Sequence, residues 1–191
     1  MRDHVVQVAL ETLASEGVAG FTTRKVAADA STSTPAVYEL FGDKAGLVRE
    51  LFFEGFRLLR GHYDTLEPSD DPVEDLIGLT QLTRSFALEN PELVQVMFSR
   101  PFAHFDPGPD ETQAGAEVRE LIVGHVRRGV ESGNLEGDPT DIAHGLLALT
   151  LGLAGAQMSS RLGTSRASIN RRWDQAVRAL LRGYGPRHSL K

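Results

Sequence analysis

Cysteine is absent from the 191 residues, which excludes disulfides, thiolate metal sites and thiol nucleophiles. Long apolar runs are absent as well, so no segment reaches the length of a membrane span. The first residues, MRDHVVQ, lack the apolar stretch of a secretory signal. We therefore expect a cytoplasmic protein without a membrane partner. A chain of this length can bury a sizeable core, in one domain or in two modest ones.

The motifs of common enzyme classes are also missing. The sequence has no G-x-S-x-G, no phosphate-binding P-loop and no G-x-G-x-x-G that opens a helix. Four histidines lie on separate segments, without the i, i+4 pairing of a helical zinc site: His62, His104, His125 and His144. We expect neither an enzyme nor a bound metal or cofactor.

Basic charge is scarce, because 20 Lys and Arg residues face 26 Asp and Glu residues and the net charge is −6. Phosphate contacts dominate affinity for nucleic acids, so this balance argues mildly against a DNA-binding protein. The positions of individual basic side chains therefore matter more than their total.

The stretch from Thr22 to Gly46, TTRKVAADASTSTPAVYELFGDKAG, predicts two short helices, a tight turn between them and the start of a third helix. Thr22 can cap the first of these helices, and Val26, Ala27 and Ala30 have the spacing of one buried face. Residues 31–33 supply the turn and the next cap. This is the outline of a helix-turn-helix.

The second helix of this motif keeps its apolar side chains on one face. Val37 and Phe41 are four residues apart and should point inward. Asp43 can cap the following helix, where Lys44 and the N-terminal amides would act together on one phosphate. The remaining faces carry groups suited to a major groove: Ser33, Thr34, Ala36, Tyr38 and Glu39.

Four segments resemble the DNA-binding domain of TetR-family transcriptional regulators: VVQVALETLASEG, TTRKVA, STPAVYELF and DKAGLVREL. The family places a threonine pair before its second helix, a tyrosine ahead of a phenylalanine in its recognition helix and a lysine at the start of its fourth helix. The matching residues are Thr22 with Thr23, Tyr38 with Phe41, and Lys44.

The resemblance implies that residues 1–48 bind double-stranded DNA. The chain departs from the family in the turn, where Ser31 and Thr32 replace the usual Gly-Val and predict a left-handed residue other than glycine. Tyr38 could instead pack on the core, and Arg24 could be a solvated helix charge. The predicted DNA contacts are Thr23, Arg24, Ser33, Thr34, Ala36, Tyr38, Glu39 and Lys44.

The rest of the chain, residues 49–191, also reads as helical, with about nine helices in the whole protein. The three prolines of residues 99–115 predict a loop there, and residues 66–72 predict a linker. Apolar spacing predicts helices over residues 3–15, 44–62, 72–88, 91–97, 117–133 and 140–160 and a last one that begins after Ser165.

The last two helices carry more apolar surface than a small monomer needs. Small residues form a stripe along residues 140–160, where another helix can approach closely. In TetR-like proteins the last two helices pair with those of a second subunit, and the resemblance implies the same homodimer and a pseudo-palindromic operator. The predicted dimer interface is Gly152, Gly155, Ile169, Trp173, Val177 and Leu180.

The resemblance also implies an effector cavity in the C-terminal domain, for a mostly apolar small molecule with one or two polar anchors. Each candidate lining residue also fits an ordinary helical core. These candidates are Phe86, Met97, Phe98, Phe102, Phe105, His125, His144, Gln157 and Met158.

The sequence thus predicts an all-α protein with a three-helix DNA-binding domain at 1–48 and a helical effector-binding and dimerisation domain at 49–191. Its function would be transcriptional regulation, by a repressor that a small-molecule effector releases from its operator. The alternative is a helical small-molecule-binding or protein-interaction module that no longer reads DNA. Two features favour it: residues 1–49 carry six acidic and five basic side chains, and the turn is unusual.

Overall fold

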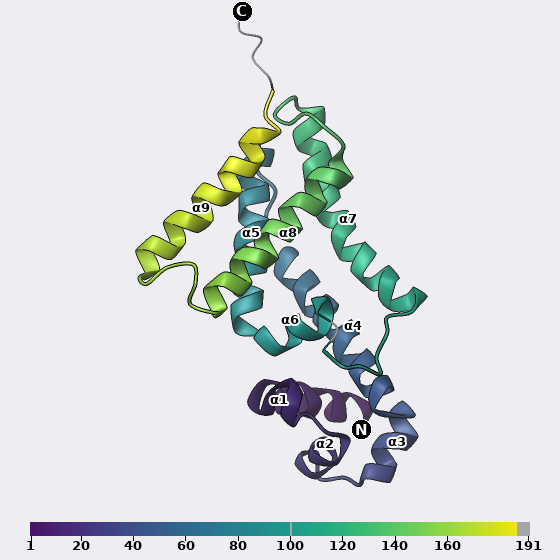
Figure 1. The fold of residues 1–191 in the computed structure, drawn as a ribbon. Helices are drawn as coiled ribbons and strands as arrows, with labels where there is room; N and C mark the ends of the chain where they lie inside the picture. Colours follow the sequence, from purple (N-terminus) through teal and green to yellow (C-terminus); the bar gives the residue numbers. More distant parts are fainter. Residues whose placement is uncertain (100, 187–191) are drawn as a thin grey trace, which may run out of the picture. The chain divides into compact units, whose positions relative to one another are not determined.

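The computed structural model describes residues 1–99 and 101–186. Within these ranges all regular structure is helical, which confirms the all-α fold class (Figure 1). None of the helices in this part of the chain is long and apolar enough to cross a lipid bilayer. Arg100, in the expected loop, and residues 187–191, in the expected C-terminal domain, lie outside the described residues. The described helices are α1 (Arg2–Gly20), α2 (Thr23–Asp29), α3 (Thr34–Phe41), α4 (Lys44–Tyr63), α5 (Pro72–Glu89), α6 (Pro91–Phe98), α7 (Pro109–Glu131), α8 (Pro139–Met158) and α9 (Arg166–Gly183).

The helices divide into two compact units. Unit 1 comprises Met1–Leu58 and Asn90–Gly115, and unit 2 comprises Leu59–Glu89 and the chain from Ala116 onward. Helices α4 and α7 therefore contribute residues to both units. The functional boundary at residue 48 remains a prediction.

Three side-chain caps define α2, α3 and α4. Thr22, Ser33 and Asp43 each accept a hydrogen bond from the backbone N–H three residues later, at 3.2, 3.2 and 2.8 Å. These bonds satisfy donors that a helix start leaves free. Gly17 interrupts α1 with φ 67° and ψ 178°. The three caps agree with the predicted helix starts, but the first helix, expected over residues 3–15, continues after the kink at Gly17 and ends at Gly20.

The loop predicted at residues 99–115 is wrong for its last part, because α7 begins at Pro109. Proline suits a first helical turn, where its missing N–H costs nothing. Asp110 and Glu111 lie in the same turn, where the helix dipole favours negative charge. Glu111 also reaches back, and its Oε2 accepts a hydrogen bond from Gly108 N at 2.9 Å.

The core of unit 1 is rich in phenylalanine. The ring of Phe52 lies 5.0 Å from that of Phe56 and 5.6 Å from that of Phe105. Phe56 also contacts Phe98 edge-on at 5.7 Å. Such pairs stabilise a core beyond the area they bury. They join α4 to α6 and to the segment that follows α6.

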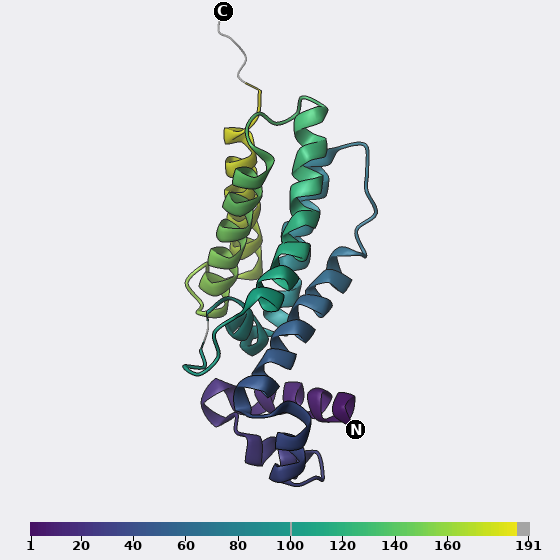
Figure 2. The same cartoon turned by 90° about the vertical axis from the view of Figure 1, so that its right-hand side faces the viewer.

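In unit 2, α5, α8 and α9 pack on one another (Figures 1 and 2). Trp173 of α9 is fully buried, and its indole Nε1 lies 3.5 Å from Thr80 Oγ1. Tyr63 and Thr83 share a buried hydrogen bond of 2.7 Å. Burial raises the pKa of Tyr63 to about 12, so the phenol stays neutral and hydrogen-bonded.

A buried carboxylate fastens the start of α5 to α7. Asp75 accepts hydrogen bonds from Arg128 Nη1 at 2.9 Å and from Ser69 Oγ at 2.7 Å. Burial by itself pushes the pKa of Asp75 upward, but the bonds from Ser69 and Arg128 outweigh it and leave the pKa below its ordinary value.

Candidate DNA-binding interface

The turn between α2 and α3 has the left-handed geometry that its sequence predicts. Ser31 has φ 53°, which is unusual for a residue other than glycine. The turn closes by hydrogen bonds from Ser31 N to Ala28 O at 3.1 Å and from Thr32 N to Ala27 O at 2.9 Å. Ser33 then returns to extended backbone and starts α3.

The two sides of α3 differ as predicted. Val37 is fully buried and Phe41 is 9% exposed, so these two side chains hold the helix on its domain. Tyr38 is 45% exposed, which excludes the interpretation that it packs into the core. Ser33 and Glu39 are exposed, and Thr34 and Ala36 are half-buried. The outward side therefore offers hydroxyls, one carboxylate and an aromatic ring.

Of the two DNA contacts predicted on α2, one lies on the surface and the other lies in the core. Arg24 is exposed. Lys25 pairs with Asp29 at 3.0 Å and Glu16 at 3.6 Å, so its charge is already compensated. Thr23 is only 6% exposed, and we correct its prediction as a DNA contact because its side chain belongs to the core of unit 1.

Lys44 is held in a half-buried setting at the start of α4. Its Nζ donates a hydrogen bond to Phe21 O at 2.8 Å and lies 4.8 Å from the centre of the Phe102 ring. Burial lowers the pKa of Lys44, because the ammonium loses water on folding. An ammonium has three donors, so one bond to a carbonyl leaves capacity for a phosphate.

Two further contacts position this end of α4, and the sequence patterns missed them. A Cβ added at Gly46 would lie 1.8 Å from Phe41 O, so only glycine lets α4 start this close to the end of α3. Arg49 Nε pairs with the buried carboxylate of Glu111. A glycine within a helix has no recognisable sequence pattern. The same holds for an ion pair between two residues that are far apart in the sequence.

Arg2 fastens α1 to α3 and α4. Its guanidinium lies 4.7 Å from the centre of the Phe41 ring and 2.6 Å from Glu50 Oε1, and it donates to Leu40 O. One of the few basic residues in this part of the chain is therefore structural.

The nine predicted effector-pocket residues fall into both units. In unit 1, Met97 and Phe105 are buried, while Phe98 and Phe102 are half-buried. Phe102 covers Lys44, and its ring lies 5.6 Å from that of Phe21. These four side chains pack within unit 1, and Phe102 also contacts Lys44.

In unit 2 the predicted pocket residues have different surroundings. Phe86 is buried, whereas His144 and Met158 are exposed on α8, which corrects their assignment to an enclosed pocket. His125 is half-buried, and its Nδ1 has no hydrogen-bond partner among the described residues. Gln157 accepts a hydrogen bond from Arg84 at 2.8 Å.

The core of unit 2 contains a void of about 10 Å³. That is close to the space one water molecule needs. Four hydroxyl groups line it, from Tyr63, Thr80, Thr83 and Thr150, beside leucine and isoleucine side chains. Its lining contains none of the nine predicted pocket residues, because these hydroxyls come from three different helices and share no spacing in the sequence.

The residues predicted to form the dimer interface differ in how exposed they are. Added Cβ atoms at Gly152 and Gly155 would meet nothing within 4 Å, so space beside them is open. Ile169 and Leu180 are half-buried. Trp173 and Val177 are 0% exposed, and we correct their assignment because their side chains are buried within the single chain.

Comparisons with known proteins agree with this architecture. The family described as bacterial regulatory proteins, tetR family, matches residues 5–51, and the tetracyclin repressor-like C-terminal domain matches residues 76–180. No curated protein matches the chain.

Solved structures share the fold over almost the whole length. A protein of unknown function from Rhodococcus sp. RHA1 has a TM-score of 0.83 at 26% identity, over 97% of this chain and 95% of that one. A putative tetR family transcription regulator from Shewanella sp. PV-4 has a TM-score of 0.74 at 19% identity, over 97% and 98%. The TetR family transcriptional regulator PfmR from Thermus thermophilus has 0.70 at 18% identity, over 93% and 97%.

Fold and site together define a helix-turn-helix protein whose recognition helix is capped and exposed, followed by a helical C-terminal domain. The chain belongs to the TetR family. It is a DNA-binding transcriptional regulator, and its fold points to a non-enzymatic role.

Proposed function

We propose that the protein is a cytoplasmic homodimeric repressor that binds a pseudo-palindromic operator and leaves it when a mostly apolar small molecule binds. The observation that carries this proposal is α3, which is capped at Ser33, anchored by Val37 and Phe41, and open to solvent on its other side. Such a helix can enter a major groove without rearranging its own domain.

We assign the base-facing role to Ser33, Thr34 and Ala36 at the start of α3, where Ala36 can contact a thymine methyl. Tyr38, Arg24 and Lys44 would bind phosphates and set the register of the helix on the duplex. Glu39 is exposed on the same helix and would disfavour any register that brings it near a phosphate.

The proposed dimer contact runs along α8 and α9. Open space beside Gly152 and Gly155 lets a second helix approach closely, and Ile169 and Leu180 supply apolar contact. Two copies related by a two-fold axis would place their recognition helices about 34 Å apart, one turn of DNA.

We place effector entry at the void of unit 2 bounded by Tyr63, Thr83 and Thr150. Its leucine and isoleucine walls suit an apolar molecule, and its hydroxyls would be the polar anchors. Because the void is small, an effector must displace side chains of α5, α7 or α8 as it enters. A shift of α4 or α7 would then change the contacts of Lys44 with Phe102 and of Arg49 with Glu111.

Selection of bound sequences from random DNA by the purified dimer tests the operator proposal, followed by titrations at several salt concentrations. We expect a half-site repeat of about 10 base pairs and a steep loss of affinity with salt. Lys44→Ala should make the salt dependence shallower by about one counterion. Lys25→Ala is the matched control, because Lys25 is already paired with acids of its own domain.

The dimer proposal is tested by sedimentation of Gly152→Leu, which adds bulk where the protomer has open space. We expect it to become monomeric while it keeps its helix content. Gly124→Leu is the control, since space beside Gly124 is open as well. Equal dimerisation of both variants would contradict this interface. Negligible, salt-independent binding of every selected DNA sequence would contradict the operator proposal.

A further inference from the structure

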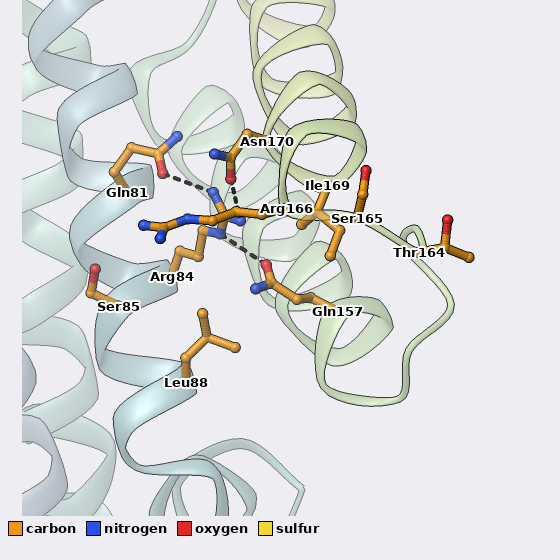
Figure 3. A pocket seen from close by; sticks show the side chains of 10 residues that line it. All are labelled: Gln81, Arg84, Ser85, Leu88, Gln157, Thr164, Ser165, Arg166, Ile169 and Asn170. Carbon is orange, nitrogen blue, oxygen red and sulfur yellow. Dashed lines mark hydrogen bonds between the residues drawn. The ribbon is translucent and has the colours of Figure 1, made fainter.

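A hollow of about 620 Å³ opens in unit 2, and we call it the α5–α9 hollow (Figure 3). Its walls come from α5, the end of α8, the connection after α8 and the start of α9. Its volume lies within the range of sites for organic ligands. It shares no lining residue with the void around Tyr63, so it is a second cavity.

Arg84 lies across this hollow in a fixed orientation. Its Nε, Nη1 and Nη2 donate to side-chain oxygens of Gln157, Gln81 and Asn170 at 2.8, 3.3 and 2.9 Å (Figure 3). Its guanidinium carbon lies 4.8 Å from the centre of the Trp173 ring. Because the three amides accept with their oxygens, their NH₂ groups remain as donors.

The partners of Arg84 are neutral, so its charge is not cancelled. Arg166 extends into the same hollow, and no Asp or Glu is among the described residues that line it (Figure 3). Burial lowers the pKa of Arg84, and the positive charge of Arg166 lowers it further. Arg166 also opens α9, where the helix dipole is positive and no acid lies in the first turn.

We propose that the α5–α9 hollow binds a small organic carboxylate. Three of the five N–H donors of Arg84 are used by the amides, so the two that remain and the guanidinium of Arg166 would bind the carboxylate together. Leu88 and Ile169 line the same hollow and provide contact for a short hydrocarbon chain. A bare inorganic anion would leave most of this volume empty.

The test uses the full-length dimer and the sodium salts of butyrate, hexanoate and octanoate, with octanol and inorganic phosphate as reference ligands. Calorimetric titration should detect at least one carboxylate, and Arg166→Gln should weaken its binding by about tenfold, the loss of one charge-assisted contact. Arg171→Gln is the matched control, because Arg171 is exposed on the same helix outside the hollow. Its binding should equal that of the wild type.

The position of the bound carboxylate is determined independently, by modifying arginine side chains with phenylglyoxal and identifying the modified residues by mass spectrometry. The bound carboxylate should protect Arg84 and Arg166 and leave Arg171 reactive. This readout needs no substitution at Arg84, which could disturb folding through its contact with Trp173.

Four outcomes would overturn the proposal. The first is that none of the carboxylates binds, and the second is that Arg166→Gln and Arg171→Gln bind the carboxylate equally well. The third is that phosphate or octanol binds as tightly as the best carboxylate. The fourth is that Arg166→Gln weakens the dimer but leaves carboxylate binding unchanged. The last would make the hollow part of an interface between copies. The first three outcomes are independent of operator binding, and all four are independent of the void around Tyr63.

Discussion

Lys44 in unit 1 and Arg84 in unit 2 are both held against aromatic rings, and the two arrangements differ. In unit 1, Lys44 has one bond to a carbonyl and lies near the rings of Phe21 and Phe102. In unit 2, Arg84 has three bonds to amide oxygens and lies over the fully buried Trp173.

The difference concerns how easily each charge can change its partner. Lys44 has a flexible stem and free donors, so a phosphate can compete for it. Three bonds in a planar fork fix Arg84, so it presents its charge in one direction whether or not a ligand is present. An aromatic neighbour is therefore compatible with a movable cation and with a fixed one.

The largest effect on stability should come from removing the ring of Trp173, which lies against Arg84 in unit 2. Trp173→Ala removes a fully buried ring, and we expect a loss of about 3–5 kcal/mol in the free energy of unfolding, measured by urea titration. Phe102→Ala, the counterpart beside Lys44, is half-buried and should cost clearly less. Equal losses would mean that the burial of these two rings does not determine how much each stabilises its unit.

A smaller loss should follow from moving the backbone that carries Lys44. Gly46→Ala places a Cβ in contact with Phe41 O, so we expect about 3 kcal/mol of destabilisation and loss of operator binding. Gly61→Ala in the same helix has open space and should be neutral or stabilising by up to about 1 kcal/mol. A stable, DNA-binding Gly46→Ala protein would contradict this explanation.

Each unit also has a buried carboxylate paired with an arginine, and acid should release both. The pKa values of Asp75 and Glu111 lie below their ordinary values, where burial is outweighed by their hydrogen bonds and by the arginine partner. A lowered carboxyl pKa contributes stability above its ordinary value, and that stability is lost as pH falls through the folded value. We expect Asp75→Asn and Glu111→Gln each to flatten the acid side of a plot of melting temperature against pH.

The same two variants also compare the units directly. Near neutral pH each should cost about 1–3 kcal/mol, because the arginine loses a charged partner. Melting curves that keep the wild-type pH dependence in both variants would show that these carboxylates do not control acid stability.

The smallest expected effect concerns the ring above Lys44 alone. Phe102→Leu keeps apolar volume and removes the cation–π contact with Phe102 but not the one with Phe21, so stability should fall by only about 0.5–1 kcal/mol. The freed ammonium should bind operator phosphate more readily, and we expect affinity to rise two- to threefold on the same DNA. Weaker operator binding with unchanged folding would instead make Phe102 a positioning residue for Lys44.

The DNA-binding part was predictable because its signals are local. A cap, an apolar spacing of three or four residues and a turn act within one helix length, so Thr22, Ser33 and Asp43 were found from their neighbours alone. The same local signals were misleading at residues 109–115. The prolines there indicated a loop, but Pro109 is the first residue of α7, where proline fits well.

The side of a helix that faces the core was harder to predict in the C-terminal part. Helix α8 is apolar nearly all round, so its spacing did not distinguish buried positions from exposed ones such as Met158. Trp173 and Val177 have the same spacing as the half-buried Ile169 and Leu180, yet their side chains are buried within the single chain.

The sequence by itself determined the all-helical fold class, the capped and exposed recognition helix and the family, because each depends on residues that are close along the chain. Only the tertiary structure decided the neighbours of Lys44 and Arg84, the need for glycine at position 46 and the α5–α9 hollow. These depend on side chains from segments far apart in the chain, and their meeting is set by helix packing, which residue spacing does not encode.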